Sequence, residues 1–436
     1  MSGLYRLCQQ QFHLSENKTT LRTEVLAGIT TFATMSYVLA TIPNMLGEAG
    51  LPKDAILTAL ILMVMLCSVA MALYTNRPFV LAPGMSSVAV IGTTIQSAGI
   101  PVEVGFGLIF LSGVIFALIS FVGLRELVVK AIPASVKISI SAGIGLFISL
   151  IGLKSGGIIV SSSEDALAFG NLSTPKALLF GIGFVVLLFL EARRFRGSMI
   201  VSILVVTLLG IPMGVTLVPE SMVHLPASAA SAAFRIDILG ALRPEYFPWL
   251  VTFFVPDFFG TMGIILGVAN RADWLDEQGN MPGIERCFKV DSLSTVAGSF
   301  FSMPVMTTYL ESVSGVEDGG RTGLTSIVTA GMFGLMLLFT PLALMIPLVA
   351  TGPVLTYIGL QMLGAMKNIN YEDMTEYVPA FIAVAMTIFT NNIANGLSLS
   401  VLTYVFLKAA AGRWKEIHPA MYGLAAFLIY YLSTLL

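Results

Sequence analysis

Charged residues are scarce in this sequence. Only 11% of its 436 residues are Asp, Glu, Lys or Arg, 56% are hydrophobic, and the formal net charge is −2. Soluble domains carry about 25% charged residues, so this composition and the mean hydropathy of +0.88 indicate a polytopic membrane protein. The small net charge offers no general attraction for nucleic acid. The lipid bilayer is one expected partner, and any small-molecule partner must be inferred from individual polar residues.

Cysteine and histidine are equally rare. The three cysteines, Cys8, Cys67 and Cys287, are odd in number and show no C-x-x-C spacing, which predicts buried, reduced thiols and neither a disulfide framework nor a thiolate metal site. All three histidines lie in predicted tails or loops, which argues against a histidine proton relay or metal site inside the membrane. These histidines are His13, His224 and His418.

Motifs of energy-coupled or hydrolytic enzymes are missing as well. The chain contains no P-loop, nucleophile elbow or H-E-x-x-H motif, which argues against an ATP-driven pump and an intramembrane zinc protease. We therefore expect no enzyme activity, no catalytic residues, no metal and no cofactor. The polar tail at residues 1–22 is not a secretory signal, so the first hydrophobic segment is a retained span.

Long apolar runs predict an all-α polytopic membrane protein of about 14 transmembrane segments, because a helix needs about 20 apolar residues to cross a bilayer. A polar stretch divides the chain into an N-terminal tail (1–22), a first seven-span repeat (23–218), a connecting loop (219–246) and a second seven-span repeat (247–436). The first repeat has spans near 23–45, 54–74, 79–98, 103–123, 133–153, 175–190 and 198–218. The second has spans near 247–270, 286–302, 304–315, 322–340, 342–365, 377–411 and 419–436.

Basic residues predict the orientation. The loops after the fourth and sixth spans carry Arg125, Lys130, Arg193, Arg194 and Arg196, which places them and the N-terminus in the cytoplasm and the connecting loop outside. The run at 377–411 is too long for one helix and is interrupted by polar residues, so it forms two short helices or a re-entrant hairpin. The interrupting residues are Asn391, Asn392, Asn395 and Gly396.

Two interrupted segments occupy matching places in the two halves. They are RPFVLAPGMSSVAVIG in the third span and SMPVMTTYLESVSGVEDGG in the tenth. Each begins with a proline-containing extended stretch and continues into small residues, which predicts a short strand leading into a half-helix whose N–H groups point at the protein centre. Because an odd number of spans inverts the topology, the halves are expected to be inverted repeats, a common plan of secondary transporters.

Two acidic residues lie within apolar segments, Asp257 in the eighth span and Glu311 in the tenth. An ionised group in hydrocarbon is costly, so such residues mark a transport pathway by default. On a helical wheel, Thr261 shares the face of Asp257. Gly263 and Gly267 form a small-residue strip that we expect to serve packing only.

Near Glu311 lie Thr307, Thr308 and Tyr309. For the two threonines, we expect bonds back to their own helix rather than ligand contact. The Asn391, Asn392 and Asn395 cluster has two open interpretations, a pathway lining or a helix break.

Five segments are FVPDFFGTMG, MTTYLESVSGVEDGGRTGL from Met306, PLALMIPLVATGPVLTYIGL, LAPGM and the N-terminal LSENKTTLRTEVLAGITTF. They resemble the azaguanine-type purine permeases of the nucleobase:cation symporter (xanthine/uracil permease) family, and the similarity covers nearly the whole chain. The resemblance implies a core domain that moves against a gate domain. It places substrate between half-helices three and ten, with Asp257 and Glu311 as acidic ligands, Tyr309 next to the base, and facing backbone from Ala82 to Ser87. The substrate-binding residues predicted in this way are Asp257, Glu311, Tyr309, Thr308, Thr261, Gly84, Met85, Ser86 and Ser87.

The sequence departs from the family pattern at Gly260 and Val88, where the purine permeases usually carry an acid and an asparagine. The function that we expect is proton-coupled uptake of purine nucleobases such as hypoxanthine, guanine or adenine across a bacterial inner membrane. Glu311 and Asp257 would carry the coupling proton, sodium remains an alternative, and a homodimer is compatible with this view. The rivals are a carrier of another small polar or anionic solute on the same fold, and a membrane enzyme or sensor that uses the paired carboxylates.

Overall fold

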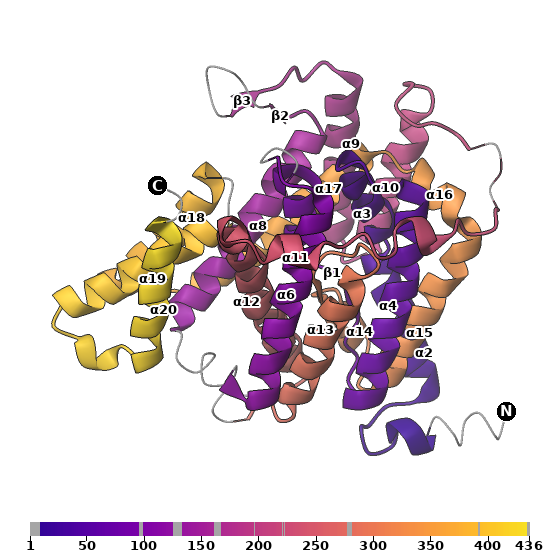
Figure 1. The fold of residues 1–436 in the computed structure, drawn as a ribbon. Helices are drawn as coiled ribbons and strands as arrows, with labels where there is room; N and C mark the ends of the chain where they lie inside the picture. Colours follow the sequence, from indigo (N-terminus) through magenta and orange to yellow (C-terminus); the bar gives the residue numbers. More distant parts are fainter. Residues whose placement is uncertain are drawn as a thin grey trace.

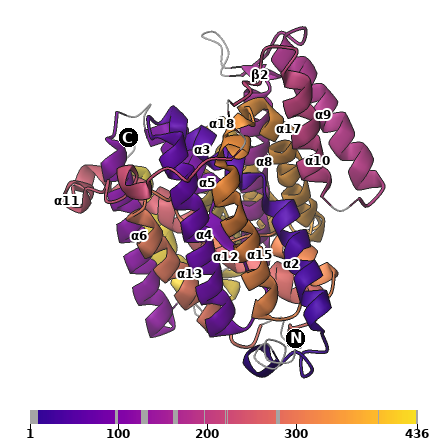
Figure 2. The ribbon, with the colours of Figure 1, turned by 90° about the vertical axis from the view of Figure 1, so that its right-hand side faces the viewer.

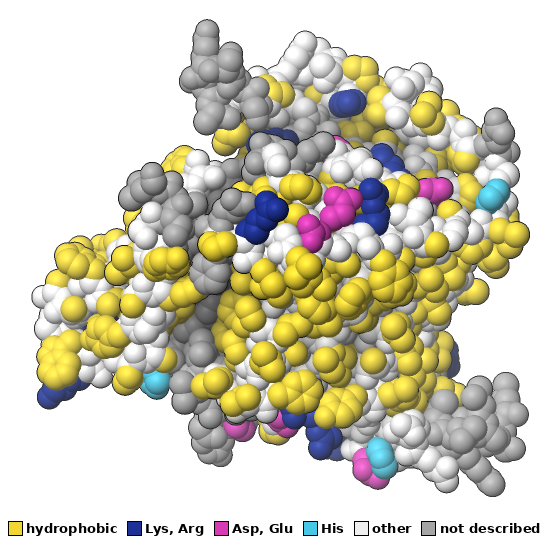
Figure 3. Space-filling view, in the orientation of Figure 1, with side chains coloured by type: hydrophobic (Ala, Val, Ile, Leu, Met, Phe, Trp, Pro, Cys, Tyr) yellow, Lys and Arg dark blue, Asp and Glu magenta, His cyan; other side chains and the backbone are white. Residues whose placement is uncertain are grey.

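A computed structural model of the chain describes residues 9–95, 99–124, 133–160, 167–195, 197–219, 221, 223–276, 281–390 and 393–433. Its surface carries a broad apolar band, with charged side chains gathered above and below it (Figure 3). Among the described residues, six helical segments are long and apolar enough to cross a membrane, and further apolar helices are shorter. The expectation of a polytopic membrane protein is confirmed.

The first half contains α2 (Leu21–Met35), α3 (Val38–Glu48), α4 (Lys53–Thr75), β1 (Leu81–Pro83), α5 (Met85–Ala89), the π-helical turn η1 (Val90–Ile95), α6 (Val102–Val122), α8 (Ala134–Ser155), β2 (Ile159–Val160), β3 (Ala168–Phe169), α9 (Pro175–Ala192) and α10 (Ser198–Gly210). The first predicted span is thus two helices with a break at Ser36 and Tyr37. The third span is the predicted strand and half-helix. Strands β2 and β3 form a small hairpin on the side opposite the N-terminus (Figure 1).

The connection between the halves holds η2 (Ala229–Ser231), α11 (Ile238–Ala241) and η3 (Pro244–Tyr246). The second half contains α12 (Phe247–Arg271), α13 (Ile284–Ser299), β4 (Met306–Thr308), α14 (Ser312–Glu317), α15 (Gly323–Leu335), η4 (Met336–Phe339), α16 (Thr340–Met345), α17 (Leu348–Leu363), η5 (Gly364–Asn368), α18 (Met374–Phe389), α19 (Ile393–Ala410), η6 (Trp414–Glu416) and α20 (Pro419–Ser433). The tenth span is again a strand and a half-helix.

In the second half, the run at 377–411 is divided into two helices, α18 and α19, as one of the two expectations had it, and these helices pack on each other and on α8. The eleventh span continues through α16 to Met345, beyond the predicted end at residue 340, because α17 begins only after Pro347. Of the interrupting asparagines, Asn391 and Asn392 lie outside the described residues, as do Arg125, Lys130 and Arg196 of the predicted cytoplasmic loops.

The helices form two groups (Figure 2). In one group, α13 packs on α6 and on α4, α15 packs on α4 and α2, and α12 packs on α6. In the other, α17 and α18 pack on α8, and α9 packs on α10 and α17. The groups meet where α5 and α12 contact α8. The fold therefore places the two half-helices and α12 beside the boundary between the groups.

Candidate substrate-binding site

Strands β1 and β4 hold the two half-helices together. They pair antiparallel, with Leu81 opposite Thr308 and Pro83 opposite Met306. The Gly84 amide donates to the Val305 carbonyl at 2.8 Å, which extends the pairing beyond β1. An antiparallel pair, with a half-helix following each strand, is the arrangement that inverted repeats produce.

Gly84 joins β1 to α5, and its lack of a side chain permits the close approach of β4. A Cβ at Gly84 would lie 3.0 Å from the Thr307 methyl carbon. The Ser87 hydroxyl donates to the Gly84 carbonyl at 2.8 Å, so in this conformation it closes the first turn of α5. Met85 and Ser87 are buried and Ser86 is partly buried.

Glu311 lies immediately before α14 and is partly buried. The Tyr37 hydroxyl donates a hydrogen bond to Glu311 Oε1 at 2.8 Å. Tyr37 comes from the break between α2 and α3 and is only 3% exposed. Span 1 therefore reaches the tenth-span carboxylate directly, a contact that the sequence motifs did not indicate.

Asp257 belongs to a different set of polar groups. The Thr261 hydroxyl lies 3.4 Å from Asp257 Oδ1 and 3.1 Å from Asp291 Oδ2, and 2.6 Å from the Thr307 hydroxyl. Because a hydroxyl has a single proton to donate, Thr261 can donate to only one of these carboxylates at a time. Asp257 is 4% exposed, and both Thr261 and Asp291 are fully buried.

Asp291 was not among the sequence-predicted site residues, yet it anchors β4. Its Oδ1 accepts a hydrogen bond from the Thr308 amide at 3.1 Å. It lies on α13, within a predicted span. The signal that identified Asp257, an acid within an apolar segment, could have identified Asp291 too.

Two sequence expectations about small residues were wrong. Thr307 and Thr308 lie in strand β4 and bond to Thr261 and Asp291, not back to a helix of their own. Gly263 and Gly267 are exposed, and an added Cβ would meet no described atom within 4 Å. They therefore do not form a packing strip with the described part of the chain.

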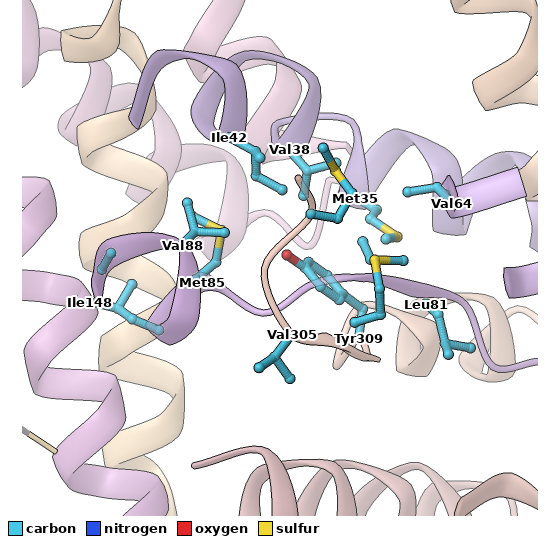
Figure 4. Packing of buried hydrophobic residues seen from close by; sticks show 14 of the residues in the cluster. Met35, Val38, Ile42, Val64, Leu81, Met85, Val88, Ile148, Val305 and Tyr309 are labelled. Atoms are coloured by element: carbon cyan, nitrogen blue, oxygen red, sulfur yellow. The ribbon is translucent and has the colours of Figure 1, made fainter. Parts of the chain in front are cut away.

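Tyr309 connects the two strands at the centre of the site. Its hydroxyl donates to the Pro83 carbonyl at 2.5 Å, and its amide donates to the Val80 carbonyl at 2.9 Å. Its ring lies among apolar side chains from span 1 and α5, including Met35, Val38 and Met85 (Figure 4). In this conformation Tyr309 braces the crossing of the strands.

The tenth-span motif also has a purely structural part. The buried Glu24 carboxylate of α2 accepts hydrogen bonds from the Arg321 amide at 2.9 Å and the Thr325 hydroxyl at 2.6 Å. The Arg321 guanidinium donates to the Val316 carbonyl at 2.6 Å. These bonds satisfy backbone groups at the end of α14 and the start of α15, so the G-G-R-T part of the motif fastens span 1 to spans 10 and 11.

The structure places two of the three cysteines and all three histidines. Cys67 and Cys287 are free and buried, whereas Cys8 lies outside the described residues. His13, His224 and His418 are all exposed. Within the described ranges, no group of three or more His, Cys, Asp and Glu residues could hold a metal ion.

Comparison with known proteins decides the family. Residues 22–401 match the model of a permease family. The chain belongs to this family. An adenine permease of Escherichia coli is 35% identical over 97% of this chain and 95% of its own length. A guanine/hypoxanthine permease of Bacillus subtilis is 33% identical over 94% of this chain and 96% of its own.

A solved structure supports the fold. The transmembrane domain of the cyanobacterial bicarbonate transporter BicA superposes with a TM-score of 0.62 at 16% identity, covering 87% of this chain and 97% of that one. The family match and the relatives confirm the resemblance to nucleobase permeases, and the solved structure confirms the expected membrane-transporter fold. This permease is a multi-pass membrane protein and not an enzyme.

Proposed function

We propose that this permease is a proton-coupled carrier that takes up nucleobases, chiefly the purines hypoxanthine, guanine and adenine, by alternating access across the bacterial inner membrane. The observation that carries the proposal is the position of Asp257 and Glu311 near the β1–β4 crossing, together with full-length relatives named as adenine and guanine/hypoxanthine permeases.

The chemistry of a purine suits this arrangement. A purine edge presents N–H donors beside a ring nitrogen or carbonyl acceptor, and a carboxylate next to backbone N–H groups complements such an edge. Asp257, on a long helix and next to Thr261, is the proposed acceptor for the N–H groups of the base. The turn from Gly84 into α5 is the proposed source of backbone donors.

Glu311 is the proposed binding site of the coupling proton. Its carboxylate lies at the joint between β4 and α14, where a half-helix starts. Protonation and base binding would stabilise one another if both favour the same conformation. The contacts of α5 and α12 with α8 support alternating access, because movement between the helix groups would change which side of the membrane the site faces.

Uptake by whole cells tests the proposal. Cells lacking their own nucleobase carriers would express the protein and be given radiolabelled hypoxanthine, guanine, adenine, xanthine or uracil, with and without a protonophore. We expect accumulation of at least one purine that the protonophore abolishes. Replacing external sodium with potassium should leave uptake unchanged. Expression in the membrane without accumulation of any base would refute nucleobase transport, and sodium-dependent uptake would refute proton coupling.

The proposed orientation has the N-terminus in the cytoplasm. Single cysteines in the N-terminal tail and in the connecting loop at 219–246, introduced into a cysteine-free background, should differ in labelling by a membrane-impermeant maleimide. We expect labelling of the loop alone in intact cells. Labelling of the tail alone would reverse the orientation.

A further inference from the structure

Span 1 is interrupted at the depth of the half-helices. Hydroxyl groups before the interruption bond back to carbonyls of their own helix, from Thr31 to Ala27 at 3.0 Å and from Ser36 to Ala33 at 3.0 Å. Such back-bonding bends helices. The chain then turns through Ser36 and Tyr37 before α3 begins at Val38. Tyr37 is therefore held at a joint.

The side chain of Tyr37 has one polar contact that matters here. Its hydroxyl donates to Glu311 Oε1 at 2.8 Å, and the residue is 3% exposed. A buried tyrosine needs an acceptor for its O–H, and a carboxylate is about twice as strong an acceptor partner as a neutral group. Met35 and Val38, on either side of this joint, lie near Tyr309 in the same buried cluster (Figure 4).

This bond is not needed to dock span 1. Lower in the same span, Thr34 and Ser314 share a hydroxyl hydrogen bond of 2.9 Å, and the Thr30 hydroxyl donates to Asp318 at 2.6 Å. The buried Glu24 carboxylate also ties α2 to the start of α15. The Tyr37 contact is distinct because it reaches the acid that the proposed function assigns to the coupling proton.

We propose that Tyr37 is a positioning residue for Glu311, and that the joint in span 1 responds to the protonation of that carboxylate. The Tyr37 hydroxyl donates to Oε1 of Glu311, so Oε2 is the oxygen that takes the coupling proton. A proton arriving at Oε2 leaves Oε1 as a neutral carbonyl oxygen, which weakens the bond from Tyr37 and loosens the joint. Tyr37 keeps its own proton throughout, and the coupling proton leaves from Oε2. This inference rests on the proposed function.

The test compares two tyrosines that each donate to a glutamate. Tyr37→Phe removes the hydroxyl and keeps the ring. The matched control is Tyr357→Phe, because the Tyr357 hydroxyl donates to Glu191 Oε2 at 3.0 Å between α17 and α9, within the other helix group. Both purified variants would be reconstituted in proteoliposomes. Uptake of the base that the wild-type protein accumulates would be measured from pH 5 to pH 8.

We expect Tyr37→Phe to raise KM about tenfold, the equivalent of losing one charged hydrogen bond. The midpoint of its pH–uptake curve should move to higher pH, because the charged form of the carboxylate loses a donor. Tyr357→Phe should keep the wild-type midpoint. In a Glu311→Gln background, where KM is measured by exchange of labelled for unlabelled base at equal pH, Tyr37→Phe should change KM by less than about twofold. A wild-type midpoint in Tyr37→Phe, or additive effects of the two substitutions, would overturn the proposal.

A substrate-free measurement separates this inference from the proposed function. Thermal unfolding in detergent of the wild type, Tyr37→Phe, Glu311→Gln and the double variant forms a double-mutant cycle. We expect a coupling between the two positions that shrinks at low pH, where the carboxylate is protonated. A cycle without coupling refutes the Tyr37 assignment whatever the protein transports. Absence of uptake by the wild type, with coupling intact, refutes only the proposed function.

Discussion

The two intramembrane carboxylates of this permease are held in different ways. Asp257 projects from α12, a continuous helix of 25 residues, and neighbours the Thr261 hydroxyl and, through it, Asp291 of α13. Glu311 lies at the joint between a three-residue strand and a short half-helix, and accepts its hydrogen bond from span 1. One carboxylate is set in a rigid part of the second repeat, and the other lies where separate elements meet.

This difference suggests a division of roles. A group that recognises a ligand benefits from a fixed orientation on a rigid element. A group that couples protonation to movement must contact elements whose arrangement can change. Asp257 fits the first description, and Glu311 fits the second.

Neutralising each acid separately should have the largest effects and should separate the two roles. Asp257→Asn should lower uptake about 100-fold and abolish binding of the purine, because the amide cannot replace a carboxylate acceptor for N–H groups. Glu311→Gln should abolish accumulation driven by a proton gradient but retain exchange of labelled for unlabelled base across proteoliposomes at equal pH.

The controls for this pair are binding to purified protein and membrane abundance. If Asp257→Asn kept wild-type binding, or Glu311→Gln kept proton-driven accumulation, the assigned roles would be wrong. Exchanged phenotypes would mean that the two acids have the opposite roles.

Asp291 of α13 supports β4 through its hydrogen bond with the Thr308 amide. Asp291→Asn replaces an acceptor for the Thr308 amide and the Thr261 hydroxyl, so we expect uptake to fall about 30-fold through misplacement of β4. Ser292→Ala is the matched control. Ser292 is equally buried, but its hydroxyl donates to the Phe288 carbonyl within its own helix. Uptake by Ser292→Ala should stay within about twofold of wild type. Equal losses of uptake in the two variants would mean that Asp291 does not support β4 specifically.

A smaller effect is expected at the strand crossing. Gly84→Ala would bring a Cβ to 3.0 Å from the Thr307 methyl carbon, which forces β4 and α5 slightly apart. We expect about a fivefold lower uptake, equivalent to about 1 kcal/mol. Gly263→Ala adds the same methyl group on α12, where no described atom lies within 4 Å, and should leave uptake unchanged. A wild-type rate for Gly84→Ala would show that the crossing tolerates expansion.

The contrast between the carboxylates also shows what the sequence could predict. The apolar runs, the two proline-containing segments and the isolated acids predicted the spans, the half-helices and the candidate positions of Asp257 and Glu311, because these features are local. The partners were not predictable in the same way. Tyr37 and Glu311 are separated by 274 residues, and nothing in the local pattern of span 1 indicates which acid its hydroxyl meets.

The roles of Thr307 and Thr308 were missed for a related reason. Their hydroxyls were expected to bond within a helix, but the pairing of β4 with β1 keeps this segment extended. The threonines then lie next to α12 and α13, and bond to Thr261 and Asp291. Long-range strand pairing therefore decided the local hydrogen bonding.

The smallest expected effect lies outside the membrane, where a carboxylate is paired with basic residues. Glu416 accepts from Arg413 Nε at 2.7 Å and from the buried Lys408 at 2.8 Å, and these partners lower the pKa of Glu416 from 4.5 to about 2. A lowered folded-state pKa stabilises the protein above about pH 4.5, and this contribution is lost as the pH falls toward 2. Glu416→Gln should therefore lower the Tm slightly at pH 7 and less at pH 3.

Glu372→Gln is the control for this last prediction, because Glu372 is exposed on the neighbouring loop and forms no ion pair with the described residues. Its Tm should match wild type at both pH values. Uptake should be unchanged in Glu416→Gln, since this cluster joins the loop before α18 to the loop after α19, away from the strand crossing. If Glu416→Gln lost the pH dependence of uptake, proton coupling would involve a third carboxylate in addition to Glu311 and Asp257.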